Sequence, residues 1–367
     1  MNTTAPRHAE LAVYTPAESV AVYTTGETAP VIYTSVDHTL SDAARAAVEA
    51  GMPDSTRRAY TSDWTAFETW CAKHGRVSLP ATPQTVTEYV VHLTVTLSIR
   101  TGRPLGPSSI ERALASIRTW HTFANETPPQ TKAARKVLSG YRERLAITHD
   151  PAAQPRKADP AVPETLRAML ATVDRTTLAG MRDAALLLLG YACAARVSEL
   201  VALDIANVTE TADGLLVAVY RRKIKTFTEV AVPYGRVPAT CPVRAVRALL
   251  AAMADAGRTS GPMLVRIDRH GRIAPPMMRN GLPIGDPLGR MTSDAAADVV
   301  TRIAGTAGLD GRWTGHSLRR GFATAARRAG ANLERIGRHG GWADGSRALV
   351  GYLEEGDRWV DNPVTGL

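Results

Sequence analysis

The chain has 367 residues and a mass of 39.3 kDa, which is enough for two ordinary domains. Its hydrophobic content of 44% supports packed cores and argues against wholesale disorder. No apolar run approaches the ~18 residues of a membrane span, and the N-terminus lacks a signal-peptide core. Three scattered cysteines give neither a disulfide framework nor a zinc-binding spacing. We therefore expect a cytoplasmic protein that makes no use of a membrane.

The net charge of +9 is unevenly distributed. Residues 1–50 carry six acids and two bases, a net charge of −4, so the remaining residues carry +13. A basic body of this kind suits a polyanion, and nucleic acid is the commonest one. Charge that serves solubility alone is the alternative.

The sequence divides into a tail, two domains and a linker. Residues 1–50 are expected to be a weakly ordered acidic tail. Residues 51–148 predict an all-helical domain, because a helix from Asp54 places Trp64, Phe67 and Cys71 on one face, and helical patterns follow at 84–98, 107–125 and 131–147. The stretch "HDPAAQPRKADPAVP" at 149–163 has four prolines and reads as a linker.

Residues 164–367 predict a second domain that is mostly helical, with a small antiparallel sheet. A helix begins at Pro163, and an apolar helix covers 184–194. Two β-branched runs around a basic turn at 214–235 indicate a hairpin. Further helices are expected at 243–256, 293–307, 315–329, 332–338 and 346–355. The fold class is therefore mainly α, with an α+β second domain.

Two of the motifs in this domain place basic side chains after apolar runs. In "AARVSEL" Arg196 follows a buried helix and needs an anion or a carboxylate, and Glu199 three residues later supplies the simplest intramolecular partner. In "RRKIKTF" the hairpin turn carries Lys223 and Lys225, although a lysine there is usually a solvated edge residue.

Two more motifs lie near the C-terminus. In "WTGHSLRRGFATAARRAG" His316 and Arg319 project from one helical face at a helix start, where anions are favoured, and Gly315 allows a close approach. A charged surface stripe is the alternative. Tyr352 follows a "HGGW" turn on a short segment between glycines, where it is either a packing residue or a reactive phenol.

Together these groups supply the parts of a phosphoryl-transfer site. Arginines neutralise phosphate oxygens, a lysine protonates a leaving alkoxide, a histidine shares the nucleophile's proton, and an indole N–H from Trp342 adds a donor. Tyr352 is then the nucleophile of a covalent intermediate. No acidic cluster or Gly-rich phosphate loop suggests a metal or a cofactor, and we expect neither.

The order Arg, Lys, His-x-x-Arg, His/Trp, Tyr resembles the tyrosine recombinases, also called phage-type integrases, and in particular the Cre-like members with tryptophan at the fifth position. The stretches "GHSLRRG", "RAGANLERIGRHGGW", "GYLEEGD" and "LVRIDRHGRIAP" carry the likeness, which spans about residues 54–360. Trp342 and Tyr352 are one residue further apart than is usual in the family, with Gly345 the extra residue.

The resemblance implies site-specific cleavage and rejoining of DNA through a 3′-phosphotyrosyl intermediate and a Holliday junction, for integration, excision or resolution. It implies that the helical core-binding domain and the catalytic domain form a C-shaped clamp on double-stranded DNA with an inverted-repeat site. It also implies that four protomers assemble in the synaptic complex. We expect the tail after Tyr352 to dock on a neighbouring protomer. Lys225 is preferred to Lys223 because the family lysine usually precedes a small polar residue. The implied catalytic set is Arg196, Lys225, His316, Arg319, Trp342 and Tyr352, with Glu199 in support. The implied DNA-contacting residues are Arg57, Arg58, Ser108, Ser109, Arg112, Arg266 and Arg269.

Two other functions share parts of this pattern. A non-catalytic DNA-binding protein on the same scaffold would be expected to lack one or more of the six catalytic residues, and all six are present. A type IB topoisomerase would use the same phosphotyrosine chemistry without exchanging partners, but the helical domain and the "GGW" turn favour a recombinase. Telomere-resolving enzymes share the chemistry of the recombinases, and only the substrate DNA would separate the two.

Overall fold

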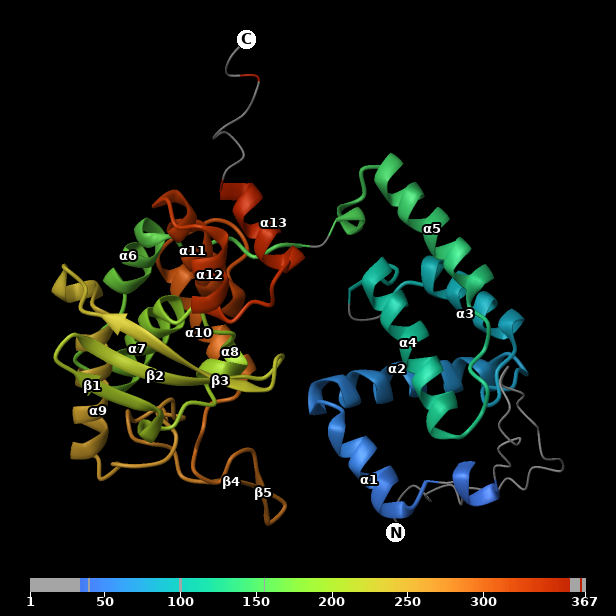
Figure 1. Ribbon diagram of the computed structural model, residues 1–367, viewed down its shortest axis with the longest axis horizontal. Coiled ribbons are helices and arrows are strands. Elements are labelled where there is room, and N and C mark those ends of the chain that lie inside the picture. The colour runs from blue at the N-terminus through green and yellow to red at the C-terminus, as the bar shows by residue number, and fades with distance from the viewer. Residues whose placement is uncertain (1–33, 39, 99–100, 155, 357–363, 365–367) are drawn as a thin grey trace, which may run out of the picture. The chain divides into compact units, whose positions relative to one another are not determined.

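A computed structural model describes residues 34–38, 40–98, 101–154, 156–356 and 364. The chain forms two compact units, Met1–Arg156 and Lys157–Leu367, and the boundary falls inside the proline-rich stretch 149–163. The predicted fold class, mainly helical with small antiparallel sheets, is confirmed (Figure 1). In the described part of the chain, no helix has both the length and the apolar character to cross a membrane.

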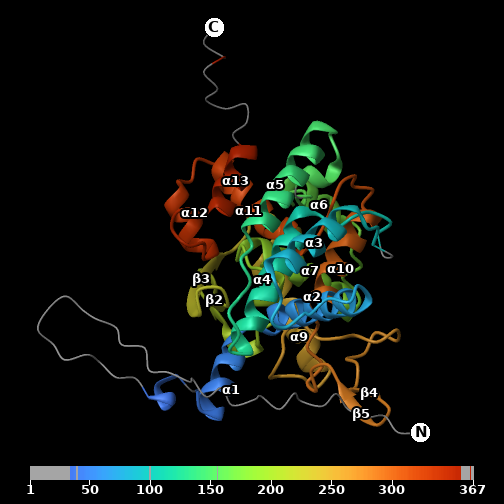
Figure 2. The same ribbon diagram turned by 90° about the vertical axis from the view of Figure 1, so that its right-hand side faces the viewer.

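The first unit is built on four helices that begin and end within a few residues of their predicted positions. They are α2 (Asp54–Lys73), α3 (Pro83–Val95), α4 (Pro107–Phe123) and α5 (Lys132–Ile147). Helix α2 packs against α4, and α3 packs against α5 (Figure 2). Phe67, Ile110 and Leu138 are fully buried at their centre, as the predicted apolar faces require.

One helix of this unit differs from the prediction. All but the last residue of helix α1 (Asp42–Gly51) lies in residues 1–50, which we expected to be weakly ordered. Its sequence "DAARAAVEAG" is rich in alanine and has Asp42 in the first turn, so intrinsic helix propensity and a favourable dipole interaction explain it. Residues 1–33 of the predicted tail lie outside the described residues.

The second unit contains eight α-helices among its described residues, and the predicted helices are all present. They are α6 (Pro163–Ala171), α7 (Leu178–Ala192), α8 (Val197–Leu200), α9 (Pro242–Asp255), α10 (Ser293–Thr306), α11 (Gly315–Arg328), α12 (Leu333–Gly340) and α13 (Arg347–Gly356). Helix α7 begins earlier than predicted because Thr177 caps it, its hydroxyl oxygen accepting a hydrogen bond from the Gly180 N–H at 3.1 Å. The short α8 was not predicted.

The predicted hairpin at 214–235 is confirmed as β2 (Gly214–Arg221) and β3 (Thr226–Pro233), which pair in antiparallel register. A strand that the sequence pattern did not reveal, β1 (Val208–Thr211), extends it to a three-stranded sheet. A second unpredicted hairpin joins β4 (Met277–Arg279) to β5 (Leu282–Ile284). Short 3-10 turns cover Ser35–His38, Pro151–Ala153, Ile205–Asn207 and Pro238–Thr240.

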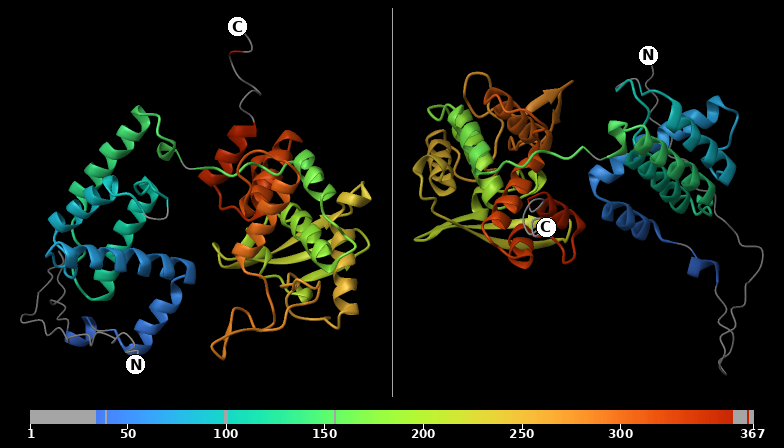
Figure 3. Two further views of the ribbon diagram at one scale, coloured as in Figure 1. Left: turned by 180° about the vertical axis from the view of Figure 1, so that it is seen from behind. Right: turned by 90° about the horizontal axis from the view of Figure 1, so that it is seen from above.

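The core of the second unit fixes one face of β2. Leu215, Val217 and Val219 point inward and are buried together with the leucines of α7. The backbone of the sheet lies beside the helices of this unit (Figure 3). Because side chains alternate along a strand, the next inward position is Arg221, which is also fully buried. A smaller cluster that includes Ile336, Trp342 and Leu349 packs among α11, α12 and α13. Strand β2 therefore ends in a buried charged residue, Arg221, beside the cluster that contains Trp342.

The end of the predicted linker is an integral part of the second unit. The Ala161 N–H donates to the Ser317 carbonyl at 2.8 Å, and the Asp159 N–H donates to the Arg312 carbonyl at 2.8 Å. Ala161 is fully buried against α11 at Gly321, where an added Cβ would lie 2.1 Å from the Ala161 oxygen. Backbone contact with α11 therefore shortens the linker that the sequence predicts.

We expect Gly321→Ala to lower the free energy of unfolding by about 1–3 kcal/mol, because the new methyl group overpacks α11 against residue 161. Gly305→Ala is the matched control, since Gly305 lies on α10 with nothing within 4 Å of an added Cβ. It should be neutral or stabilise by up to about 1 kcal/mol through helix propensity. Urea unfolding followed by circular dichroism measures both, and equal effects would contradict the packing role of Gly321.

Candidate active site

Arg196 and Glu199 form the ion pair that their spacing predicts. Arg196 precedes α8, where its backbone N–H donates to Glu199 Oε2 at 3.0 Å and its Nη1 donates to Oε1 at 2.5 Å. The Glu199 side chain is fully buried, whereas that of Arg196 is 24% exposed. One edge of the Arg196 guanidinium is therefore accessible from solvent.

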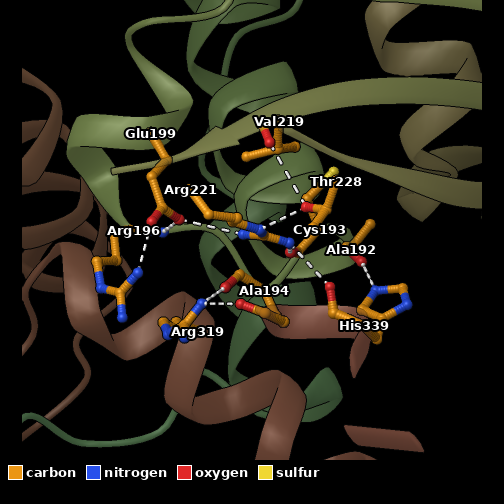
Figure 4. Close-up of polar contacts among 11 residues, drawn as sticks. Ala192, Cys193, Ala194, Arg196, Glu199, Val219, Arg221, Thr228, Arg319 and His339 are labelled. Atoms are coloured by element: carbon orange, nitrogen blue, oxygen red, sulfur yellow. Dashed lines mark hydrogen bonds and ion pairs between the residues drawn. The ribbon is translucent and has the colours of Figure 1, made fainter. Parts of the chain in front are cut away.

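Arg221 is a second partner of Glu199, and we did not single it out from the sequence. Its Nη1 donates to Glu199 Oε2 at 3.1 Å, and its Nε donates to Thr228 Oγ1 at 2.9 Å (Figure 4). Its Nη2 donates to the carbonyl oxygens of Cys193 and His339 at 3.2 and 2.8 Å. The alternation Leu215, Val217, Val219 was the signal that position 221 points into the core.

The environment of Glu199 favours its ionised form. Burial raises the pKa of this carboxyl, but the backbone N–H and guanidinium of Arg196, together with Arg221, outweigh burial and leave the pKa below its usual value. Glu199 is therefore a carboxylate at neutral pH.

Arg319 occupies the centre of the site without a carboxylate partner among the described residues. It is 2% exposed, and its Nη1 donates to the carbonyl oxygens of Ala194 and Gly340, the latter at 2.6 Å. Its Nη2 is buried and has no hydrogen-bond partner in the described part of the chain. Burial lowers the pKa of Arg319 to about 9, so the group is still a cation at neutral pH. A buried, uncompensated guanidinium is costly unless an anion joins it.

His316 lies at the start of α11, one turn before Arg319. Thr314 caps this helix and accepts a hydrogen bond from the His316 N–H at 3.2 Å. Although the His316 side chain is exposed, desolvation on its inner side lowers its pKa, and the positive charges of Arg319 and Arg196 lower it further. The imidazole is therefore neutral at pH 7 and able to accept a proton.

The close approach that we predicted at Gly315 is made by the protein itself. An added Cβ at Gly315 would lie 1.7 Å from Cγ2 of Val197, so the start of α11 packs directly on the start of α8. Packing within the protein is enough to require a glycine at position 315. This contact brings the helix starts that carry Arg196 and His316 together.

Trp342 joins Arg319 to Tyr352. The Arg319 Cζ lies 3.6 Å from the centroid of the Trp342 ring, a close cation–π contact. The Trp342 and Tyr352 rings meet edge to face, with centroids 6.4 Å apart. Tyr352 is half-buried on α13, and the buried Arg320 places its Cζ 5.6 Å from the phenol ring. The loop at 341–346 contains Gly345, the residue we identified as additional.

His339 is the other aromatic residue near this turn, but its ring is engaged elsewhere. Nε2 donates to the Ala192 carbonyl at 2.6 Å, and the ring stacks on Phe322 with centroids 4.5 Å apart. Burial lowers the pKa of His339. The geometry therefore favours Trp342 as the aromatic residue beside Tyr352.

Lys225 is the one proposed catalytic residue that has no contact with the others. It lies in the turn 222–225, exposed, with a left-handed φ of 51°. Within the described residues, neither Lys225 nor the equally exposed Lys223 takes part in a hydrogen bond or an ion pair that links it to the site. The structure brings together Arg196, Glu199, His316, Arg319, Trp342 and Tyr352, and it leaves Lys225 on a turn four residues after Arg221.

The proposed DNA-contacting residues of the first unit lie at helix starts. Arg57 and Arg58 are exposed, and Arg57 pairs with Asp54 of its own helix. Arg112 already makes a bidentate pair with Asp63, at 2.7 and 2.9 Å, which links α4 to α2. The side chain of Arg112 therefore also serves the fold. At the start of α4, Ser108 is exposed and Ser109 is half-buried.

In the second unit, Arg266 is half-buried and donates through Nη2 to the Asp286 carbonyl at 3.2 Å. Arg269 is exposed beside His270. Among the described residues, no group of three His, Cys, Asp or Glu side chains is arranged to hold a metal ion.

The lowered pKa of Glu199 generates a prediction about acid stability. Because the folded protein holds this carboxyl at a pKa below its usual 4.5, the pair contributes stability above about pH 4.5 and loses it as pH falls through the folded pKa. Glu199→Gln should therefore cost about 3–5 kcal/mol at pH 7, and less as pH falls below 4.5. Urea unfolding across this range measures the difference.

Glu164→Gln is the control, because Glu164 pairs with Arg167 at 3.9 Å on an exposed helix face. It should change stability by at most about 1 kcal/mol. A cost of Glu199→Gln that stays constant with pH would contradict the ionic role of Glu199.

Comparison with known proteins places this geometry in a family. The model of the phage integrase family matches residues 162–357. The chain is 29% identical to an integrase/recombinase xerD homolog of Selenomonas ruminantium, over 89% of each chain. It is 28% identical to the tyrosine recombinase XerD of Pseudomonas putida, over 82% of this chain and 87% of the relative.

A crystal structure of a lambda integrase dimer bound to a COC′ core site has a similar fold. The TM-score is 0.53, with 13% identity, over 88% of this chain and 96% of the other. None of these matches bears on a closer similarity to the Cre-like members, which stays a prediction. The chain belongs to the phage integrase family and is a tyrosine recombinase, an enzyme of site-specific DNA cleavage and rejoining.

Proposed function

We propose that this recombinase breaks a DNA strand by attack of the Tyr352 phenol on a phosphodiester held by Arg196 and Arg319. One observation carries the proposal. The carboxylate of Glu199 pairs with Arg196 and Arg221, whereas the nearby buried Arg319 has no carboxylate partner and its Nη2 has no hydrogen-bond partner in the described part of the chain. A phosphate supplies both the missing charge and the missing acceptor.

The strand-breaking step forms a bond between the Tyr352 oxygen and phosphorus and breaks the bond from phosphorus to the 5′ oxygen. A free phenol has a pKa near ~10, so its proton has to leave as the bond forms. The neutral His316 accepts that proton, and Lys225 donates one to the departing 5′ oxygen. The products are a 3′-phosphotyrosyl linkage and a free 5′-hydroxyl.

Rejoining is the same step in reverse. A 5′-hydroxyl from the partner strand attacks the phosphotyrosine, so the energy of the broken bond is conserved in the covalent intermediate. Arg196 and Arg319 bind the non-bridging oxygens in both directions. Trp342 keeps the guanidinium plane of Arg319 fixed through its ring, and its indole N–H is a further donor to the transition state.

The substrate in this proposal is double-stranded DNA with an inverted-repeat site. Exchange between two duplexes cuts four strands, so four protomers form the synaptic complex and pass through a Holliday junction. The helical unit, residues 51–148, and the catalytic unit, residues 164–367, clamp the DNA, with contacts from Arg57, Arg58, Arg266 and Arg269. The tail at 353–367, with Trp359, is proposed to dock on a neighbouring protomer, although Trp359 lies outside the described residues.

We expect Tyr352→Phe to bind DNA normally and to form no covalent adduct, because the attacking oxygen is removed while the ring that packs on Trp342 is kept. A nicked suicide substrate that traps the wild-type enzyme measures this by gel electrophoresis. Tyr352 is the only tyrosine after Tyr234, so no other phenol near the C-terminus replaces it. If the Tyr352→Phe variant still forms a covalent adduct with DNA, Tyr352 is not the nucleophile.

We expect Lys225→Ala to bind DNA but to cleave it roughly 10²–10⁴-fold more slowly, the usual contribution of a general acid. A substrate with a 5′-thiolate leaving group should restore the rate, because a thiolate leaves without protonation. Lys223→Ala is the matched control from the same exposed turn and should cleave both substrates at the wild-type rate. If the thiolate substrate rescues Lys223→Ala instead, the general acid is Lys223.

A further inference from the structure

We infer that Arg221 is a positioning residue that holds the Lys225 turn against the phosphate-binding arginines. The inference rests on the proposed function, because it assigns Lys225 the role of general acid. Its basis is the set of contacts made by one fully buried guanidinium at the base of that turn (Figure 4).

Arg221 connects the segments that carry the other site residues. Through Glu199 Oε2 it is joined to α8 and hence to Arg196. Through the His339 carbonyl it is joined to the end of α12, three residues before Trp342. Through the Cys193 carbonyl it holds the end of α7, next to the Ala194 carbonyl that binds Arg319. All of these segments meet at one side chain.

Arg221 also fixes the turn itself. It is the last residue of β2, its carbonyl accepts a hydrogen bond from the Ile224 N–H at 3.1 Å, and its Nε donates to Thr228 on the opposite strand at 2.9 Å. The outer face of the hairpin gives little support, since Phe227 is 65% exposed. Because the Lys225 side chain makes no hydrogen bond or ion pair with the described residues, its position depends on this internal anchor.

Only an arginine suits this position. Its planar group presents several N–H donors in fixed directions, whereas lysine presents a compact ammonium and methionine presents none. The backbone is also shaped to admit it, because an added Cβ at Gly341 would lie 2.7 Å from the Arg221 Nε. Loss of the guanidinium should therefore loosen the Lys225 turn. Any disturbance of the other segments would slow cleavage whatever the leaving group, whereas a displaced Lys225 slows only cleavage that needs a general acid.

The test measures single-turnover covalent adduct formation on two substrates, one with the normal 5′ oxygen and one with a 5′-thiolate leaving group. A misplaced general acid slows only the first. We expect Arg221→Met to cleave the oxygen substrate roughly 10–100-fold more slowly than wild type and to raise the sulfur-to-oxygen rate ratio by about tenfold or more. The cleavage rate and the rate ratio of Arg221→Lys should lie between those of wild type and Arg221→Met.

Arg182→Met is the matched control. Arg182 is another buried arginine with a carboxylate partner, donating to Asp183 at 2.7 Å and to the Val265 carbonyl at 3.2 Å. Its loss should destabilise the protein without changing the rate ratio. Should Arg221→Met fail to fold, Thr228→Val removes the hydroxyl that accepts from Nε, together with its long 3.5 Å bond to the Val219 carbonyl, and keeps the guanidinium. It should raise the ratio in the same direction by a smaller factor.

The outcomes separate the inference from the proposed function. If wild type forms no adduct at Tyr352, the proposed function fails. If wild type forms the adduct but the thiolate does not rescue Lys225→Ala, the general-acid assignment fails. If Lys225→Ala is rescued and the ratio for the Arg221 and Thr228 variants equals that of wild type, the positioning role of Arg221 is refuted.

Discussion

The buried carboxylate of Glu199 is the interaction on which the catalytic unit depends. It holds Arg196 and Arg221 at the junction of α8, β2 and the end of α12, where it is fully shielded from water. Removing one partner of such a buried pair typically costs about 3–5 kcal/mol, because a charge is left uncompensated. One acid among three arginines also leaves the site positive. The same interaction therefore supports the fold and creates the demand for an anion.

The positive charge of Arg319 is held in place without being neutralised by the described residues. Backbone carbonyls of Ala194 and Gly340 orient its guanidinium without neutralising it, and the Trp342 ring covers one face. Ala194 reaches this arrangement with a left-handed φ of 45°, an unfavourable conformation for a residue with a side chain. The backbone conformation of Ala194 lowers the stability of this loop. It also orients the Arg319 cation, whose Nη2 has no hydrogen-bond partner among the described residues.

Sequence reasoning predicted the periodic features well, because helical faces and strand alternation are local. It located the helices of both units, the β2–β3 hairpin and the ion pair between Arg196 and Glu199. It could not find α8, because four residues are too few for a periodic pattern. Nor could it find the left-handed Ala194, whose carbonyl binds Arg319, or the contact of Gly315 with Val197, because these involve residues distant in sequence. Arg221 is intermediate: strand alternation indicated an inward side chain, but its partners come from four other segments.

In the "HGGW" turn two glycines allow side chains of the site to pack directly against the backbone. An added Cβ at Gly340 would lie 1.8 Å from the Trp342 ring, and one at Gly341 would lie 2.7 Å from Nε of Arg221. The first glycine lets Trp342 fold back over Arg319, and the second, with a φ of 64°, lets the backbone pass beside Arg221. Two adjacent glycines thus make room for two different side chains of the site, Trp342 and Arg221. A larger side chain at either position would separate the arginines from the segment that carries Tyr352.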